Sequence, residues 1–202
     1  ENRREDCFLI SGSDYNHIRN VLRMKAGDTF LVSCGGESHL CTLEGFEEDT
    51  VVARITREGY QSTELGAEIY LFQGLPKADK MELIIQKAVE LGVSAIVPVQ
   101  TKRCVSRPDE KSLGKKVERW QKIAASAAEQ SGRGRIPEVV VLPNFSSAIK
   151  RASEADLAVM FYENERSTTL RMALESSKYE TVSLLSGPEG GLEQKEVEFA
   201  AE

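Results

Sequence analysis

The sequence predicts an α/β protein in two parts, a small antiparallel β domain followed by a larger domain built on a parallel sheet. Up to about Tyr60, short runs alternate apolar with polar residues, which is typical of half-buried strands. From Ala67 onwards, strand-like and helix-like runs follow each other regularly, which favours parallel strands joined by helices. The last strand-like run ends in a glycine-rich loop, at the place where open α/β sheets bind ligands.

The first part, residues 1–60, contains one helix-like run and three strand-like runs. Residues 13–22 carry apolar side chains at helical spacing, and Ser13 or Asp14 is predicted to cap this helix. The predicted strands are Thr29–Cys34, Ser38–Phe46 and Thr50–Arg57. A linker is expected at Gly59–Gly66, before the change of pattern.

The second part, residues 67–202, alternates between the two kinds of run. The predicted strands are Ala67–Phe72, Val93–Val99, Val139–Leu142, Leu157–Phe161 and Thr181–Leu185. The predicted helices are Asp79–Leu91, Lys115–Gln130, Phe145–Ser153, Thr168–Ser176 and Leu192–Ala201. Because parallel strands need long crossover connections, we expect a parallel sheet with helices on both faces.

The composition is that of an ordinary globular protein, with 202 residues, 41% of them hydrophobic and 29% charged. No run reaches the length of a membrane span and nothing resembles a signal peptide. The four cysteines form no CxxC pattern, which indicates reduced thiols in a cytoplasmic protein. His17 and His39 have no ligand-spaced neighbours, so we expect no metal site.

The net charge of −6 hides a basic middle third. Residues 67–137 hold 13 Lys and Arg against 8 Asp and Glu, whereas residues 1–66 hold 7 against 12 and residues 138–202 hold 6 against 12. The negative net charge of the whole chain argues against a general nucleic-acid binder, but a local positive patch can still hold phosphates. A solvated lysine-rich helix face explains the same pattern equally well.

The glycine-rich loop is Gly187-Pro188-Glu189-Gly190-Gly191. Glycine lets a ligand approach the backbone closely, and proline stiffens the turn. A tight turn without a ligand is the open alternative. The usual nucleotide-binding and hydrolase motifs are missing: the first strand of the second part is followed by Gln73-Gly74-Leu75-Pro76-Lys77, which is not GxGxxG, and the sequence contains no GxxxxGK[ST] or GxSxG.

Several short motifs occur in a specific order and spacing. They are His17-Ile18-Arg19-Asn20-Val21-Leu22-Arg23, Leu75-Pro76-Lys77-Ala78-Asp79-Lys80-Met81-Glu82, Gln86-Lys87-Ala88-Val89-Glu90-Leu91-Gly92-Val93, Ala127-Ala128-Glu129-Gln130-Ser131-Gly132-Arg133, Ile136-Pro137 and the glycine-rich loop. Together they make the chain resemble the RsmE family, bacterial enzymes that methylate N3 of a uridine in the 16S RNA of the small ribosomal subunit. The resemblance extends from about His17 to the last residue.

The resemblance implies a SPOUT fold for residues 67–202, an α/β domain with a trefoil knot that binds S-adenosylmethionine. It also implies a PUA-like RNA-binding β domain in residues 1–60, a homodimer, and 16S RNA in the small subunit as partner. Periodicity alone does not show a knot. The chain stops at Glu202 inside a helix-like run, so the segment that closes the knot in this family is expected to be missing from this sequence.

The resemblance also implies site residues. Those expected to bind the cofactor are Phe161, Tyr162, Glu163, Leu185, Gly187, Pro188, Glu189, Gly190 and Gly191, with edge packing as the alternative for Tyr162. Arg133 is the candidate to stabilise the uridine anion or a phosphate, because a guanidinium stays charged; a salt bridge at a helix end is the alternative. Glu129 and Glu189 are candidates for a polar or basic role, and a base would need a raised pKa.

Basic residues from both parts are expected to contact RNA. They are Arg19, Arg23 and Lys25 in the first part and Lys77, Lys80, Lys102, Arg103 and Arg107 in the second. Phosphate contacts would position the RNA, and an unstacked base would be read in the site. Two other function classes stay open on the sequence: an RNA-binding module without catalysis, and an α/β enzyme that acts on a small nucleotide.

Overall fold

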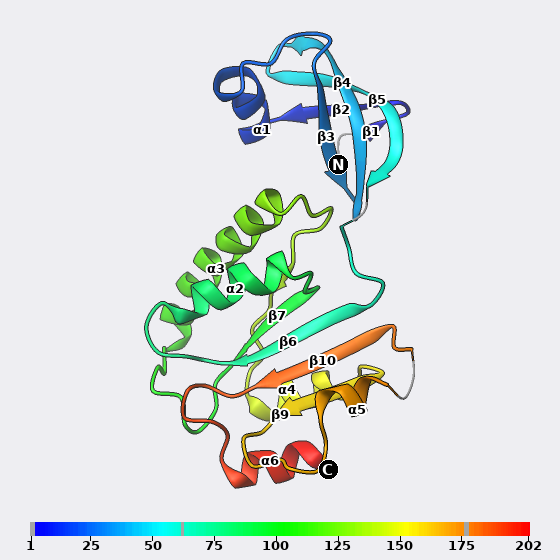
Figure 1. Ribbon diagram of the computed structural model, residues 1–202. Coiled ribbons are helices and arrows are strands. Elements are labelled where there is room, and N and C mark those ends of the chain that lie inside the picture. The colour runs from blue at the N-terminus through cyan, green and yellow to red at the C-terminus, as the bar shows by residue number, and fades with distance from the viewer. Residues whose placement is uncertain (1–2, 62, 176–177) are drawn as a thin grey trace. The chain divides into compact units, whose positions relative to one another are not determined.

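The computed structural model describes residues 3–61, 63–175 and 178–202. The chain forms two compact units, shown in Figure 1. The first consists of Glu1–Glu64 with Gly132–Arg135, and the second of Leu65–Ser131 with Ile136–Glu202. The chain therefore crosses between units three times, and the sequence did not predict the return at Gly132–Arg135.

The first unit holds one antiparallel sheet with the strand order β1-β2-β5-β4-β3. Its strands are β1 (Arg3–Arg4), β2 (Cys7–Ser11), β3 (Thr29–Cys34), β4 (Glu37–Glu47) and β5 (Thr50–Gln61). The predicted antiparallel β domain is confirmed. Strand β5 runs past its predicted end at Arg57, because it continues to pair with β4 up to Gln61 opposite Ser38. The predicted linker is shortened accordingly.

Two short helical segments, α1 (Ser13–Asn16) and the π-helical η1 (His17–Val21), lie between β2 and β3. The prediction that Ser13 or Asp14 caps this helix is wrong. The residue before the helix is Gly12 at φ 70°, and no side chain makes a cap hydrogen bond. A glycine adopts this left-handed conformation without strain, so the chain turns into the helix through its backbone alone.

The second unit holds one parallel sheet with the strand order β8-β7-β6-β10-β9, which confirms the predicted parallel α/β domain. Its strands are β6 (Glu68–Gly74), β7 (Ala95–Val99), β8 (Glu138–Val139), β9 (Leu157–Phe161) and β10 (Thr181–Ser186). Its helices are α2 (Lys80–Glu90), α3 (Glu110–Gln130), α4 (Phe145–Ala152), α5 (Leu170–Leu174) and α6 (Gln194–Ala201).

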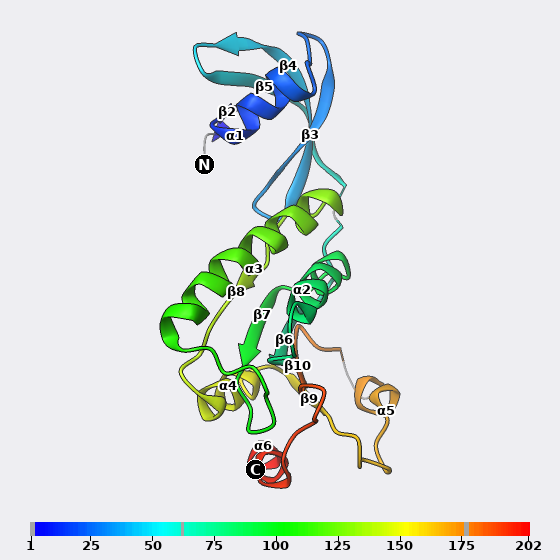
Figure 2. The same cartoon turned by 90° about the vertical axis from the view of Figure 1, so that its left-hand side faces the viewer.

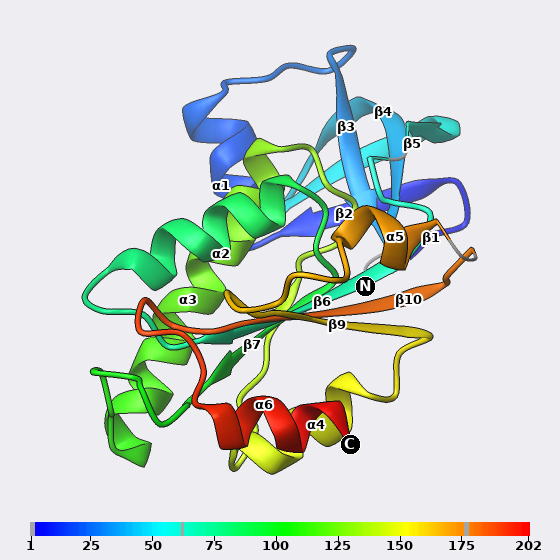
Figure 3. The ribbon, with the colours of Figure 1, turned by 60° about the horizontal axis from the view of Figure 1, so that its bottom comes forward.

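Helices cover both faces of this sheet, as predicted. Figure 3 shows α2 and α3 on one face and α4 and α6 on the other. The 21-residue helix α3, seen along its length in Figure 2, buries Trp120 and Ala124 against α2 and the sheet. On the opposite face Phe72, Leu185 and Leu192 form a second apolar core. The two cores fix the sheet whose carboxyl edge carries the loops described below.

The ends of two helices show how local sequence sets the boundaries. Helix α2 ends at Gly92, with φ 102°; its N–H donates to Val89 O and the N–H of Val93 donates to Ala88 O. This is the Schellman arrangement, in which a glycine is commonly found just after the helix. Helix α3 begins five residues earlier than predicted, because the Asp109 side chain accepts a hydrogen bond from the backbone of the first turn.

Two predictions about the second unit are wrong in detail. Strand β8 ends at Val139 instead of Leu142. The neighbouring strand has Pro98 two residues beyond the last paired residue Ile96, and proline offers no N–H for the next ladder bond. Leu91, the last residue of the predicted helix Asp79–Leu91, lies just after α2 as its C-cap and is 78% exposed. The predicted end of α5 at Ser176 falls outside the described residues.

Candidate functional site

Four loops follow the carboxyl ends of β6, β7, β9 and β10. Parallel strands point the same way, so these loops share one edge of the sheet. They span residues 75–79, 100–109, 162–169 and 187–193. The last is the glycine-rich loop, and the loops after β6 and β7 make hydrogen bonds to it.

The end of β6 supports the glycine-rich loop directly. A Cβ at Gly74 would lie 2.5 Å from the backbone nitrogen of Pro188 and 2.6 Å from its Cδ. Only a glycine at position 74 allows the two backbones to approach this closely. The neighbouring Gln73 is buried and donates from Nε2 to Gly187 O at 3.1 Å. The sequence motifs did not point to either residue, because the requirement arises from a segment more than a hundred residues away.

Glu189 joins the glycine-rich loop to the loop after β6. Both carboxylate oxygens accept from the Lys77 backbone N–H at 3.2 Å, and Lys80 Nζ lies 2.9 Å from Oε1. The hydrogen bond from Lys80 and backbone N–H groups lower the pKa of Glu189 to about 2. A carboxylate with so low a pKa is a weak proton acceptor at neutral pH. The geometry therefore favours the polar role predicted for Glu189 over the basic one.

Arg103 and Glu163 meet at the two glycines. Arg103 Nη1 donates to Gly190 O at 2.8 Å and lies 4.0 Å from Glu163 Oε1. A Cβ at Gly191, where φ is 70°, would lie 2.6 Å from that same carboxylate oxygen. The loops after β7, β9 and β10 thus converge here. Arg103, which the sequence assigned to RNA, holds the glycine-rich loop in this structure.

Helix α6 begins with an interaction that also reaches the loop after β7. Glu193 and Glu196 form a reciprocal capping box, and Glu196 Oε1 accepts the N–H of Lys102 at 2.8 Å. Glu196 is only 8% exposed, so its carboxylate is buried with these donors. Glu196 lies within the predicted helix Leu192–Ala201, but no role at the site was predicted for it. The spacing of two glutamates three residues apart at a helix start was the available signal.

The end of β9 supplies aromatic side chains. Phe161 is 43% exposed and lies opposite Ser186 of β10 in the sheet. Tyr162 donates from its hydroxyl to Gln194 Oε1 at 2.9 Å, and its cofactor role stays a prediction with edge packing as the alternative. Leu185, also predicted to bind the cofactor, has its side chain 3% exposed in the apolar core below the loop. Because the side chain of Leu185 is buried, only its backbone is left for the predicted contact with the cofactor.

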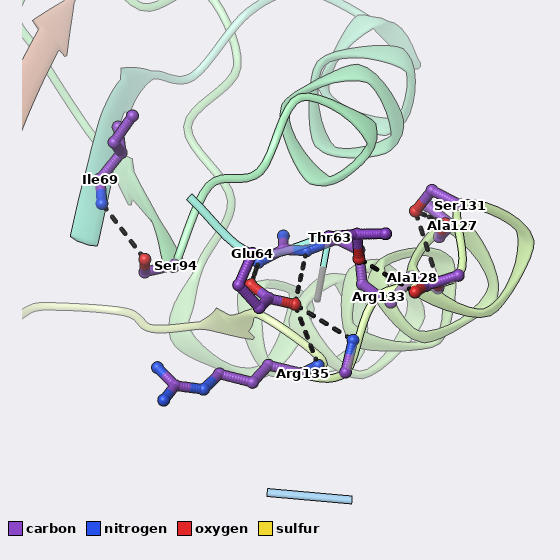
Figure 4. Close-up of polar contacts among 11 residues, drawn as sticks. Thr63, Glu64, Ile69, Ser94, Ala127, Ala128, Ser131, Arg133 and Arg135 are labelled. Atoms are coloured by element: carbon purple, nitrogen blue, oxygen red, sulfur yellow. Dashed lines mark hydrogen bonds and ion pairs between the residues drawn. The ribbon is translucent and has the colours of Figure 1, made fainter. Parts of the chain in front are cut away.

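Arg133 lies in the first unit, in an ion pair with Glu64 that Figure 4 shows. Its side chain is 3% exposed, and Nε donates to Glu64 Oε1 at 3.3 Å. Burial pushes the pKa of Glu64 up, but the hydrogen bond and charge of Arg133 and two backbone N–H groups bring it below its usual value. The three predicted catalytic residues have different surroundings: Arg133 is paired with Glu64 in the first unit, and in the second unit Glu189 is tied to Lys80 and Glu129 is exposed near the end of α3. Their catalytic roles stay predictions.

The eight predicted RNA-binding residues fall on both units. In the first, the guanidinium of Arg19 lies 5.5 Å from the centre of the Tyr15 ring and 5.3 Å from that of Phe46, while Arg23 and Lys25 are exposed. In the second, all five lie in or next to the loops after β6 and β7: Lys77, Lys80, Lys102, Arg103 and Arg107. This gathers them at the edge that carries the glycine-rich loop.

Within the described ranges, no group of three or more His, Cys, Asp or Glu side chains could hold a metal ion. No described helix combines the length and the apolar character that a membrane crossing requires.

Two family models match the chain. The RNA methyltransferase domain matches residues 63–202, and the RNA methyltransferase PUA domain matches residues 10–56. The chain is 38% identical over 201 residues to the ribosomal RNA small subunit methyltransferase E of Bacillus subtilis. This match covers 96% of this chain and 78% of the relative. The protein of the same name from Aquifex aeolicus is 28% identical, with 100% of this chain and 85% of the relative covered.

A solved structure is similar over the whole chain. It is the crystal structure of a ribosomal RNA small subunit methyltransferase E from Neisseria gonorrhoeae bound to S-adenosylmethionine. The TM-score is 0.79 at 30% identity, and the match covers 100% of this chain and 82% of that chain.

Proposed function

The chain belongs to the RNA methyltransferase family whose relatives are named ribosomal RNA small subunit methyltransferase E, and on that premise we propose its reaction. We propose that it transfers the methyl group of S-adenosylmethionine to N3 of one uridine in the 16S RNA of the small ribosomal subunit. The single observation that carries the proposal is the glycine-rich loop. It lies at the carboxyl edge of the parallel sheet, with its backbone fixed by Gly74 and Arg103.

The residues present fit the proposed cofactor. Glycines 187, 190 and 191 keep the loop free of side chains, so a nucleoside can approach its backbone. The exposed ring of Phe161 offers an apolar surface beside the strand that leads into the loop. The carboxylate of Glu163 lies next to Gly191 and suits a cationic ligand. When bound, S-adenosylmethionine supplies a methyl carbon activated for attack by a nucleophile.

The side chains of the site act by positioning. Glu189, Lys80, Arg103 and Glu196 hold the loops at fixed places, which is the condition for aligning two reactants. Exposed lysines on the neighbouring loops after β6 and β7 suit the phosphates of an RNA strand. In the proposed reaction a bond would form between N3 and the methyl carbon as the bond from that carbon to sulfur breaks. The N3 proton would leave to solvent or to a base.

The experiment that tests the proposal uses the full-length protein with small subunits prepared from cells that lack the activity. Radiolabelled S-adenosylmethionine would show transfer to the 16S RNA, and mass spectrometry of the digested nucleosides would identify 3-methyluridine. Calorimetric titration of the protein with S-adenosylmethionine separates the proposal from an RNA-binding module without catalysis. Cofactor binding without methylation of the subunit, or a methyl group on another atom or base, would contradict it.

A further inference from the structure

The segment Gly132–Arg135 belongs by sequence to one part of the protein and by packing to the other. The RNA methyltransferase family model includes it, since that match runs over residues 63–202. Its contacts nevertheless place it in the first unit, with Glu1–Glu64. The segment follows directly after α3 and leads back into the second unit at Ile136, so it adds two crossings between the units to the one from Glu64 to Leu65.

Glu64 is the centre of the contacts that hold this segment (Figure 4). Its Oε1 accepts the backbone N–H of Gly134 at 3.1 Å and that of Arg135 at 3.3 Å. The guanidinium of Arg133 donates to both carboxylate oxygens. The neighbouring Thr63 donates from Oγ1 to Gly132 O at 3.0 Å. Every residue of the segment is therefore held by Thr63 or Glu64.

Arg133 is buried in this pair and Glu64 is partly buried. The side chain of Arg133 is 3% exposed and that of Glu64 is 16% exposed. A guanidinium that forks onto a carboxylate makes a charge-assisted contact with fixed geometry. Removing Arg133 would take a buried guanidinium away from the partly buried Glu64 carboxylate, which is much more disruptive than losing a surface ion pair.

Glycines allow the segment to lie against the turn between β3 and β4. The N–H of Gly36 donates to Gly134 O at 3.1 Å. A Cβ at Gly134 would lie 2.6 Å from the carbonyl carbon of Gly36 and 2.7 Å from its oxygen. The contact is made by backbone on backbone, so a side chain at position 134 would push the segment away from the turn.

We propose that Arg133 is a positioning residue: it fastens the segment after α3 to the β unit, so that three chain crossings instead of one join the RNA-binding unit to the methyltransferase unit. This inference rests on the proposed function, and it concerns how the protein sets its affinity for RNA. The fastened segment restricts where one RNA-binding surface can lie while RNA is bound at the other. This restriction raises the effective concentration for the second protein–RNA contact. Arg133 thereby acts on RNA binding and does not touch the reacting atoms.

The test is a kinetic comparison of full-length variants on small subunits. We expect Arg133→Ala to raise KM for the subunit about tenfold or more, with kcat and the Kd for S-adenosylmethionine within about twofold of the wild type. The KM of Arg133→Lys should lie between those of the wild type and Arg133→Ala, because an ammonium group cannot donate to both carboxylate oxygens with the geometry of a guanidinium. Arg119→Ala is the matched control, since Arg119 is an exposed arginine on α3 with a surface ion pair to Glu82, and it should leave KM unchanged.

A second variant keeps the test decisive if Arg133→Ala does not fold. Gly134→Ala leaves both charged side chains in place and adds a methyl group only where the segment meets Gly36. It should raise KM in the same way and speed amide hydrogen exchange at residues 132–135. The proposal is overturned if kcat falls while KM is unchanged, which would place Arg133 at the reacting base, or if neither variant changes KM.

The exchange measurement separates this inference from the proposed function. It needs no substrate, and it reads whether Arg133 fastens the segment even if the wild-type protein fails to methylate subunits. A wild type without methylation contradicts the proposed function. Unchanged exchange in Arg133→Ala contradicts the inference.

Discussion

Gly74→Ala is the sharpest perturbation of the cofactor loop that the structure offers. The substitution adds one methyl group at the end of β6 and changes no charge or hydrogen-bonding group. The added Cβ would lie 2.5 Å from the nitrogen of Pro188, 2.6 Å from its Cδ and 2.8 Å from the carbonyl carbon of Gly187. These atoms belong to the backbone and a proline ring, so they cannot rotate out of the way as a flexible side chain would.

The size of the effect follows from these distances. Ordinary contact begins at 3.4 Å, so the loop and the strand must separate by close to 0.9 Å. Overpacking of this kind costs about 1–3 kcal/mol of stability. For a chain of this length each kcal/mol lowers Tm by roughly 2–4 °C. A loop displaced by nearly an ångström no longer presents its backbone groups correctly, and we expect at least about a tenfold loss of affinity for S-adenosylmethionine.

The assay is calorimetric titration of the full-length variant with S-adenosylmethionine, together with a thermal melt. Gly114→Ala is the matched control, because a Cβ there meets nothing within 4 Å and the residue lies inside α3. It should stabilise the protein by about 0.5–1 kcal/mol and leave cofactor binding unchanged. A folded Gly74→Ala variant that binds the cofactor as tightly as the wild type would refute this prediction. Cofactor binding would then not depend on the close packing of the glycine-rich loop against β6.

Three further predictions concern the loop and the assembly. Gly190→Val places a β-branched side chain on the loop 3.3 Å from Arg103 Cβ without backbone strain, since the positive φ belongs to Gly191; calorimetry should show lost cofactor binding with the fold kept, and normal binding would mean that the loop is only a turn. Because the pKa of Glu189 falls from 4.5 to about 2 on folding, its contribution to stability is complete above pH 4.5 and is lost as the pH falls towards 2. The difference in unfolding free energy between wild type and Glu189→Gln should therefore stay constant from pH 7 to 5 and shrink below 4.5; a decline already above pH 5 would contradict the assignment. We expect sedimentation of the full-length protein to show a homodimer at micromolar concentration, and a monomer alone would contradict this.

The sequence predicted the order of elements well because periodicity and turn residues are local signals. The helix predicted as Asp79–Leu91 is observed as Lys80–Glu90, and the strand β3 has the predicted bounds Thr29–Cys34. Local signals failed where a distant partner decided the outcome. The end of β8 depends on Pro98 in the adjacent strand, and the extension of β5 depends on its pairing with Ser38.

The candidate site was predicted only in part, for the same physical reason. The glycine-rich loop could be found because glycine and proline mark it in the sequence. Its supports could not, since the need for Gly74 arises from Pro188 and the partner of Arg133 is Glu64, 69 residues earlier. Charge alone assigned Lys80 and Arg103 to RNA, although both hold the loop in the folded protein.

The strand order of the parallel sheet has a consequence for synthesis on the ribosome. Strand β10, which follows the other described strands of this sheet in the sequence, pairs between β6 and the edge strand β9. Until residue 186 has been made, the apolar strand Glu68–Gly74 keeps one row of backbone groups unpaired. At roughly 5–20 residues per second, the remaining chain takes on the order of 6–20 seconds to arrive. During that time β6 is an open edge on which the nascent chain can pair wrongly or recruit a chaperone.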